Sequence, residues 1–296
     1  MARILFIQHR LPAPSRVEEC AVLSRPGYRR RLVRMLNMGT PARSTDPWIV
    51  RPRPNSAPAL RLFCFPYAGL GASVFRSWPA NFPASIEIVL MQPPGREGRW
   101  SVKPFLDMPS LADSATEAML PHLEVPFAFF GHSLGALESF EIARRLRRRG
   151  QPQPFHLFAS AHRAPQKPNP HPEIHGLGDR EFIDQICKQY GGIPQAVLDN
   201  PDLVELMLPC LRADFNVFEG YAYSEDSPLD CPITAFGGTR DRRVSEPEVR
   251  AWDAQTTKTF RQQMFDGDHF FLNEQRDTLI ASIMRDLTAV PAVAVG

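Results

Sequence analysis

The chain has 296 residues, of which 43% are hydrophobic and 22% are charged, and its formal net charge at pH 7 is +2. A chain of this length and composition can bury a full hydrophobic core as one domain. Its five cysteines form no C-x-x-C pair, and no apolar run approaches the roughly 20 residues that a membrane-spanning helix needs. These features argue against a disulfide or zinc framework and against a membrane protein, and we expect a cytoplasmic enzyme.

Residues 1–58 form a basic segment. They contain 11 arginines against Glu18, Glu19 and Asp46, a net charge of +8. The segment is rich in arginine and proline and has weak periodicity, which predicts a poorly ordered N-terminal extension. No recognised nucleic-acid module accompanies the charge, so we expect no nucleic-acid partner.

From residue 59 to about residue 290, short apolar runs alternate with amphipathic stretches. Consecutive apolar residues are typical of parallel strands that are buried on both faces, and alternation with helices is typical of an α/β fold. The predicted strands are 60–65, 86–91, 127–130, 155–160, 233–236 and 260–265, and the predicted helices are 107–123, 134–149, 247–255 and 274–287.

Ser133 lies at the centre of the motif GHSLG, residues 131–135, between a predicted strand and a predicted helix. In a G-x-S-x-G nucleophile elbow the serine lies on a sharp strand-to-helix turn that exposes its hydroxyl above the sheet. Gly131 and Gly135 suit such a turn because side chains there would collide with the backbone. We predict that Ser133 is a nucleophile; a plain turn rich in glycine and serine is the alternative.

A nucleophilic serine needs a general base and an acid that orients the base. In this fold class the acid and then the histidine follow the serine along the chain. Asp241 follows a buried run that ends in two glycines, and His269 lies in a late loop. We predict Asp241 as the acid and His269 as the base. We expect Asp266 and Asp268 to shape the histidine loop, and His132 to pack at the turn.

The reaction of an acyl group at Ser133 also needs backbone N–H groups that stabilise an oxyanion. One donor is expected from the residue after the nucleophile, and one from the loop after an early strand. These positions are Leu134 and, in the loop FPYAGLG of residues 65–71, Ala68. Ala68 is small and precedes Gly69, so a substrate can approach its backbone.

Between about residues 171 and 230 helical patterns follow one another without a strand. This insertion precedes the strand that carries Asp241, so we predict a helical lid over the active site, with Tyr67, Met207, Leu211 and Phe215 lining the substrate pocket. Packing of the apolar stripe on the core is the alternative, and we expect both. The apolar residues at helical spacing are Leu203, Leu206, Met207, Cys210, Leu211, Phe215 and Phe218.

Six motifs together resemble the type II thioesterases of polyketide and nonribosomal peptide synthesis, over residues 60 to 287. They are FPYAG (65–69), QPPGRE (92–97), GHSLG (131–135), LRADF (211–215), GTRD (238–241) and DHFF (268–271). Leu70 departs from the pattern, because the family often has a second glycine there.

The resemblance implies an α/β-hydrolase fold with a mostly parallel central sheet, flanking helices and a helical lid, in a domain of residues 59–290. It implies a serine thioesterase with Ser133, Asp241 and His269 as its triad, and the backbones of Ala68 and Leu134 as oxyanion donors. The substrates would be acyl or aminoacyl thioesters on the phosphopantetheine arms of carrier proteins. We expect no cofactor or metal of its own, no membrane partner, and a monomer.

Three other functions remain as alternatives. A chain-releasing thioesterase domain or cyclase uses the same chemistry, but such domains usually follow a carrier domain. A carboxylesterase or lipase uses the same triad on oxygen esters, although the sequence lacks an HGGG-type oxyanion motif. A hydrolase fold without activity could act as a binding module, and the intact set of serine, aspartate and histidine argues against that function.

Five arginines between residues 144 and 149 crowd the end of the helix that follows Ser133. Positive charge stabilises a helix C-terminus, so a solvated helix end is expected. A docking surface for an acidic carrier protein, centred on Arg147 and Arg148, is the alternative.

Overall fold

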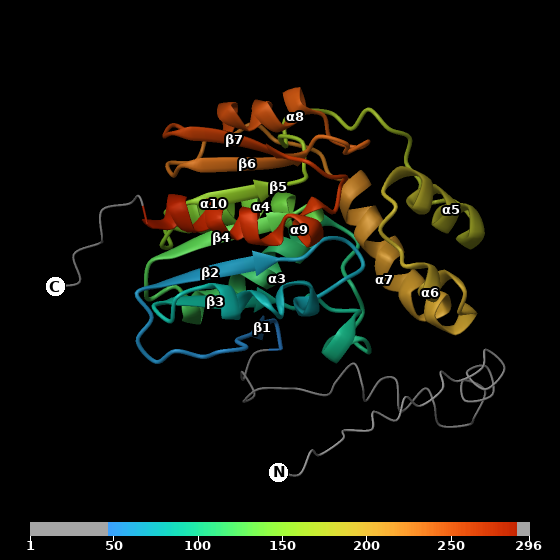
Figure 1. The fold of residues 1–296 in the computed structure, drawn as a ribbon, viewed down its shortest axis with the longest axis horizontal. Coiled ribbons are helices and arrows are strands. Elements are labelled where there is room, and N and C mark those ends of the chain that lie inside the picture. Colours follow the sequence, from blue (N-terminus) through green and yellow to red (C-terminus); the bar gives the residue numbers. More distant parts are fainter. Residues whose placement is uncertain (1–46, 289–296) are drawn as a thin grey trace, which may run out of the picture. The chain divides into compact units, whose positions relative to one another are not determined.

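The computed structural model of the protein describes residues 47–288; residues 1–46 of the predicted extension lie outside this range. Within the described residues a seven-stranded sheet has the order β1-β3-β2-β4-β5-β6-β7, and all neighbouring pairs are parallel except β1 and β3 (Figure 1). The strands are β1 (Ile49–Val50), β2 (Leu60–Phe65), β3 (Ile86–Met91), β4 (Phe127–His132), β5 (Leu157–Ser160), β6 (Ile233–Gly238) and β7 (Phe260–Phe265).

Both faces of the sheet are buried because consecutive strand residues point to opposite sides and both sets are apolar. In β2, Phe63 and Phe65 pack into one hydrophobic cluster, whereas Leu62 and Cys64 pack into another. The first cluster is covered by helices α3 (Met108–Met119), α4 (Leu134–Arg148) and α8 (Glu246–Arg250). The second is covered by α9 (Phe271–Glu274) and α10 (Arg276–Thr288), which lie in front of the sheet in Figure 1. The predicted mostly parallel sheet with flanking helices is confirmed.

Two of the flanking helices, α3 and α8, begin at recognisable capping signals. The Asp107 side chain accepts a hydrogen bond from the Ser110 amide at 2.7 Å before α3, and Ser245 and Glu248 form a capping box at the start of α8.

Three further helices separate β5 from β6. They are α5 (Asp179–Gln189), α6 (Gln195–Leu198) and α7 (Pro201–Glu219), and they lie at the end of the sheet toward which the parallel strands point (Figure 1). Phe182 and Ile186 of α5 pack with Leu211 and Phe215 of α7 in a cluster of their own. We call residues 171–230 the lid segment. Since the loops that follow parallel strands carry the functional groups of such folds, this position places the segment beside the expected site.

Strand β1 was not among the predicted strands, and it lies within the segment predicted as an extension. Trp48 and Ile49 are buried, and Ile49 pairs with Met91 of β3. The sheet therefore begins about ten residues before the predicted boundary at residue 58. Two strand residues are too few to produce a periodic pattern.

A buried carboxylate joins this N-terminal strand to the sheet. Glu87 of β3 accepts hydrogen bonds from Arg61 at 2.9 Å and from Arg51 at 2.6 Å. Arg61 also donates to Glu124, whose side chain is 58% exposed, whereas that of Glu87 is fully buried. The two acidic partners of Arg61 thus differ in burial, and Glu87 also accepts a hydrogen bond from the Asn55 amide at 3.1 Å.

Replacement of Glu87 by alanine should lower the free energy of unfolding by about 3 to 5 kcal/mol, because it removes the buried charge partner of both Arg61 and Arg51 and leaves Arg61 with only the exposed Glu124. Glu124→Ala removes the same charge from the same arginine at the surface and should cost about 0 to 1 kcal/mol. Urea denaturation of both variants measures the difference. Equal losses would contradict the importance of burial at this site.

Candidate active site

Ser133 lies in a strained turn between β4 and α4. Its φ and ψ angles are 54° and −119°, and its amide donates to the Ser160 carbonyl at 2.7 Å. A Cβ atom on Gly131 would lie 2.1 Å from the Gly135 carbonyl oxygen, and one on Gly135 would lie 2.2 Å from that of Phe65. The turn therefore requires glycine at both positions, and the strand–turn–helix context predicted for Ser133 is present.

The structure brings the three predicted triad side chains together. Asp241 follows β6, and His269 follows β7. Nε2 of His269 lies 2.9 Å from Oγ of Ser133, and Nδ1 lies 2.8 Å from Oδ2 of Asp241. Because the carboxylate can only accept, Nδ1 carries the proton and Nε2 presents its lone pair to the serine hydroxyl. This arrangement can remove a proton from Ser133.

The environment of Asp241 keeps this side chain ionised. Burial alone would raise the pKa of Asp241, but hydrogen bonds from His269 and from the Arg243 and Val244 amides outweigh it and hold the pKa below its ordinary value. The Asp241 side chain has no exposed surface and that of His269 is 4% exposed. Bulk water therefore competes little with their hydrogen bond.

The other acidic and basic neighbours have structural contacts. Asp266 pairs with Arg240 at the surface, and Asp268 accepts a hydrogen bond from the Phe270 amide at 2.7 Å. His132 is fully buried, with Nε2 2.9 Å from the carbonyl oxygen of His269 and Nδ1 2.9 Å from Oγ of Ser160. Burial lowers the pKa of His132 to about 3. A neutral His132 thus holds the backbone of the histidine loop.

The two expected oxyanion donors lie on adjoining backbone segments. Leu134 is the first residue of α4, and Ala68 lies in the loop after β2, which we call the oxyanion loop (residues 66–71). Phe65 of β2 pairs with Gly131 of β4, so the loop and the turn leave the sheet side by side. Among the hydrogen bonds of residues 47–288, neither the Ala68 amide nor the Leu134 amide has an acceptor.

A narrow pocket opens beside Ser133 and His269. Its other lining residues follow β5 or β6 or belong to the lid segment: Ala161, His162, Arg163, Tyr190, Phe218, Arg243 and Val244. Phe218 belongs to the apolar pattern of the predicted lid, although it was not among the residues predicted to line the pocket. Sequence reasoning missed the other six because they meet only through the fold and no local pattern marks them.

None of the four side chains predicted to line the pocket is among its lining residues. They pack instead on neighbouring aromatic rings or within the lid. Tyr67 packs on the rings of His132 and Phe270, with centroids 5.7 and 5.0 Å away. Met207, Leu211 and Phe215 belong to the lid cluster. Contact of these four residues with an acyl chain stays a prediction.

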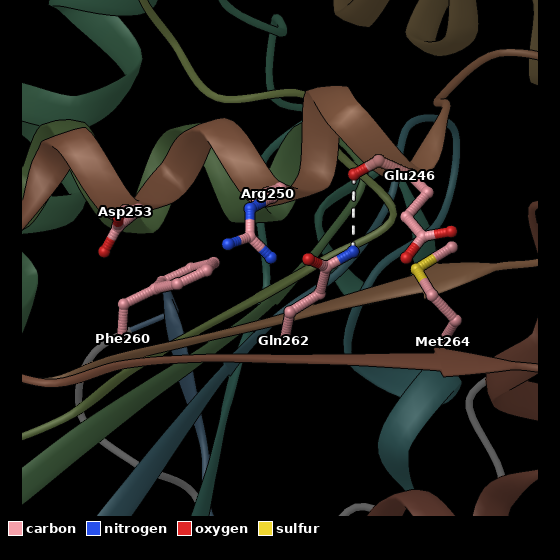
Figure 2. Close-up of a pocket in the computed structure, with 6 residues that line it drawn as sticks. All are labelled: Glu246, Arg250, Asp253, Phe260, Gln262 and Met264. Atoms are coloured by element: carbon pink, nitrogen blue, oxygen red, sulfur yellow. Dashed lines mark hydrogen bonds between the residues drawn. The ribbon is translucent and has the colours of Figure 1, made fainter.

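A wider hollow lies between α8 and β7 (Figure 2). Gln262 points toward α8 there and donates to the Glu246 carbonyl at 3.3 Å, beside Arg250, Phe260 and Met264. None of the triad residues line this hollow. We therefore assign the candidate site to the narrower pocket at Ser133.

The sheet order, the turn at Ser133 and the hydrogen-bonded triad define an α/β-hydrolase. The sequence pattern of the thioesterase domain matches residues 60–287, and the chain belongs to the thioesterase family. It is a thioester hydrolase.

Several proteins that are similar to this chain belong to biosynthetic pathways. The gramicidin S biosynthesis protein GrsT of Aneurinibacillus migulanus is 43% identical over 245 residues, which cover 83% of this chain and 95% of GrsT. The type II thioesterase BorB from the borrelidin biosynthetic cluster has a TM-score of 0.76 and 33% identity, covering 82% of this chain and 99% of BorB. The thioesterase RedJ of the Streptomyces coelicolor prodiginine pathway has a TM-score of 0.72 and 39% identity, covering 78% and 96%.

Glu138 of α4 is buried near the oxyanion loop. Its side-chain Oε1 has no hydrogen-bond partner among the described residues. Burial raises the pKa of Glu138 to about 8, although attraction to Arg96 opposes the shift. The folded protein therefore holds a proton here that the unfolded chain, with an ordinary glutamate pKa near 4.3, releases at neutral pH.

This proton predicts a pH-dependent effect of Glu138→Gln. Between about pH 5 and pH 8 the native state binds one more proton than the unfolded state at this residue, so its contribution to stability falls by up to about 1.4 kcal/mol per pH unit. Glutamine keeps the shape and does not titrate. The melting temperature of the variant relative to the wild type should rise from pH 5 to pH 8, and a difference that is constant with pH would contradict the raised pKa.

Proposed function

We propose that this enzyme hydrolyses acyl or aminoacyl thioesters on the phosphopantetheine arms of carrier proteins, and so removes aberrant or stalled acyl groups in polyketide or nonribosomal peptide synthesis. The observation that carries the proposal is the hydrogen-bonded chain of Ser133, His269 and Asp241 in a member of the thioesterase family. Relatives such as ClbQ and YbtT come from pathways of this kind.

In the proposed reaction, Oγ of Ser133 attacks the thioester carbonyl carbon while Nε2 of His269 accepts the hydroxyl proton. Asp241 stabilises the resulting imidazolium, and the N–H groups of Ala68 and Leu134 stabilise the oxyanion. His269 then gives the proton to the pantetheine sulfur as the carbon–sulfur bond breaks. The acyl group remains on Ser133 as an ester. A water molecule that gives its proton to His269 attacks this ester, and the products are a carboxylic acid and free Ser133.

This chemistry needs no cofactor or metal beyond the phosphopantetheine that the substrate carries. We propose carrier proteins as the partners, a monomeric enzyme, and the cytoplasm, where carrier proteins are made. No helix within residues 47–288 is both long and apolar enough to cross a membrane.

The arginines at the end of α4 are engaged with acidic side chains of this chain. Arg145 and Arg149 contact Asp113, and Arg147 and Arg148 contact Asp226, at 2.9 to 3.2 Å. These ion pairs neutralise much of the local charge. They favour a solvated helix end over a docking surface for the carrier protein.

Ser133→Ala should lower the kcat for release of a short acyl group from a phosphopantetheinylated carrier protein by on the order of 10⁴-fold or more. Ser139→Ala is the control, because Ser139 is buried in the helix that follows Ser133 and its hydroxyl donates to the Ala136 carbonyl. Its kcat should stay within about two-fold of the wild type, because Ser139 contacts none of the three triad residues and the transition state therefore gains nothing from it. Cleavage of a p-nitrophenyl ester without carrier deacylation would identify an esterase, and neither activity would indicate a binding module.

Asp241→Asn keeps the size of the side chain but no longer holds His269 in the tautomer with a free Nε2. The expected loss in kcat is on the order of 10⁴-fold with little change in KM. The same carrier assay measures it, and retention of most of the activity would show that another group orients His269.

A further inference from the structure

A carboxylate of the lid segment binds the backbone of the oxyanion loop. Oδ2 of Asp214, on α7, accepts a hydrogen bond from the Gly69 amide at 2.7 Å. Gly69 directly follows Ala68 and has a φ angle of +83°, and a Cβ there would lie 2.9 Å from Cδ1 of Leu211. The loop and α7 are therefore joined both by a hydrogen bond and by close packing.

The same carboxylate is fixed by a bidentate ion pair. Nη1 of Arg96 lies 2.5 Å from Oδ2 of Asp214 and Nη2 lies 2.8 Å from Oδ1. Asp214 is 4% exposed and Arg96 is 7% exposed. Burial opposes the charge on Arg96, but the attraction of Asp214 outweighs it and raises the pKa of the guanidinium. A planar bidentate pair of this kind sets the direction of the carboxylate oxygens.

Arg96 also contacts the oxyanion loop itself. Its Nη1 donates to the Leu70 carbonyl at 3.3 Å, and its Nε donates to the Pro94 carbonyl at 3.1 Å. Arg96 and Asp214 thus join three segments that are distant in sequence: the oxyanion loop, the loop after β3, and α7. Arg96 and Glu97 do not pair with each other.

Other anchors hold the loop farther along. Glu97 accepts from the Gly71 amide at 3.0 Å, and Gln92 accepts from the Ala72 amide at 3.0 Å. Asp214 instead accepts from the N–H of the peptide unit between Ala68 and Gly69. The Ala68 N–H belongs to the neighbouring peptide unit, between Tyr67 and Ala68. Since each peptide unit is planar and turns about only two soft dihedrals per residue, fixing the first of these two units restricts the direction of that N–H.

We propose that Asp214 is a positioning residue that couples the lid helix α7 to the oxyanion loop. With α7 in the position described, Asp214 holds the Gly69 amide and keeps the Ala68 N–H directed at the oxyanion. Displacement of α7 withdraws the carboxylate and releases the loop. The inference rests on the proposed role of Ala68 as a donor, and it makes transition-state stabilisation depend on lid position.

The test compares Asp214→Asn with Glu219→Gln. Both change a buried carboxylate of α7 into its amide. Glu219 instead accepts hydrogen bonds from the Ile174 and His175 amides, within the lid segment, at 2.9 Å. Both substitutions can lower the stability of the protein, and an equal loss of stability would reflect only a structural role. Hydrogen exchange in the oxyanion loop and the value of kcat are therefore the measurements that distinguish the two variants.

The rate of amide hydrogen exchange measures directly how firmly the oxyanion loop is held. In Asp214→Asn, amide exchange should quicken in a peptide that covers residues 66–71, and in Glu219→Gln it should quicken around residues 174 and 175 instead. Unchanged exchange at residues 66–71 in Asp214→Asn would overturn the coupling. This measurement does not depend on activity, so it decides the role of Asp214 as an anchor even if the wild type fails to deacylate a carrier protein.

The kcat of the same variants measures the effect of the released loop on catalysis. Loss of one oxyanion donor costs about 10²- to 10³-fold in kcat, and a donor that is misdirected but present should cost about 10- to 100-fold. We expect this loss for Asp214→Asn with KM within about two-fold, on both a carrier-bound acyl group and a p-nitrophenyl ester, and no comparable loss for Glu219→Gln. Equal losses in the two variants, or a change confined to KM, would overturn the proposal.

Arg96→Lys provides a second variant if Asp214→Asn does not fold. It keeps the positive charge but loses the bidentate geometry, so Asp214 can turn away from Gly69. The expected result is faster exchange at residues 66–71 and a kcat about three- to ten-fold below that of the wild type, and wild-type values for both would overturn the proposal.

Discussion

The turn at Ser133 brings the backbones of β2, β4 and α4 so close together that a side chain would not fit at Gly131 or Gly135. The glycine at position 135 lies against the carbonyl oxygen that ends β2, and the glycine at position 131 lies against the first turn of α4. This contact has two effects. It holds Ser133 at a positive φ angle, and it places the start of the oxyanion loop against the turn. The position of the proposed oxyanion donors is therefore set by the same contact that shapes the turn at the proposed nucleophile.

The sheet and the triad could be predicted from the sequence because each depends on a local pattern. Three strands, β2, β3 and β7, have the predicted bounds. Strands β2 and β3 are mostly apolar runs that end at a proline and a glutamine, whereas β7 has polar residues at its centre and lies between apolar ends. Ser133, Asp241 and His269 each follow a strand, and parallel strands bring the residues after their carboxyl ends to one edge. The chain order of the three groups then distinguished His269 from the other histidines.

The rest of the site could not be predicted because it depends on contacts between distant segments. Tyr190 and Arg243 line the pocket from the lid segment and from the loop after β6, and nothing in their neighbourhoods marks them. Arg96 and Asp214 are 118 residues apart, and no local pattern links them. Strand β1 is too short to be recognised as a pattern, and its pairing with β3 and the bond from Arg51 to the buried Glu87 involve residues about 40 positions away.

Within residues 47–288, strand β7 has a neighbour on one side only, and five of its six residues are half-buried or exposed. Outer strands fray at lower free energy than the centre of a sheet. His269 follows this strand by only three intervening residues, whereas Ser133 follows β4 at the centre of the sheet. The proposed base is therefore attached to the least protected part of the sheet, and the contact of its carbonyl with the buried His132 ties it back to the strand that carries the serine.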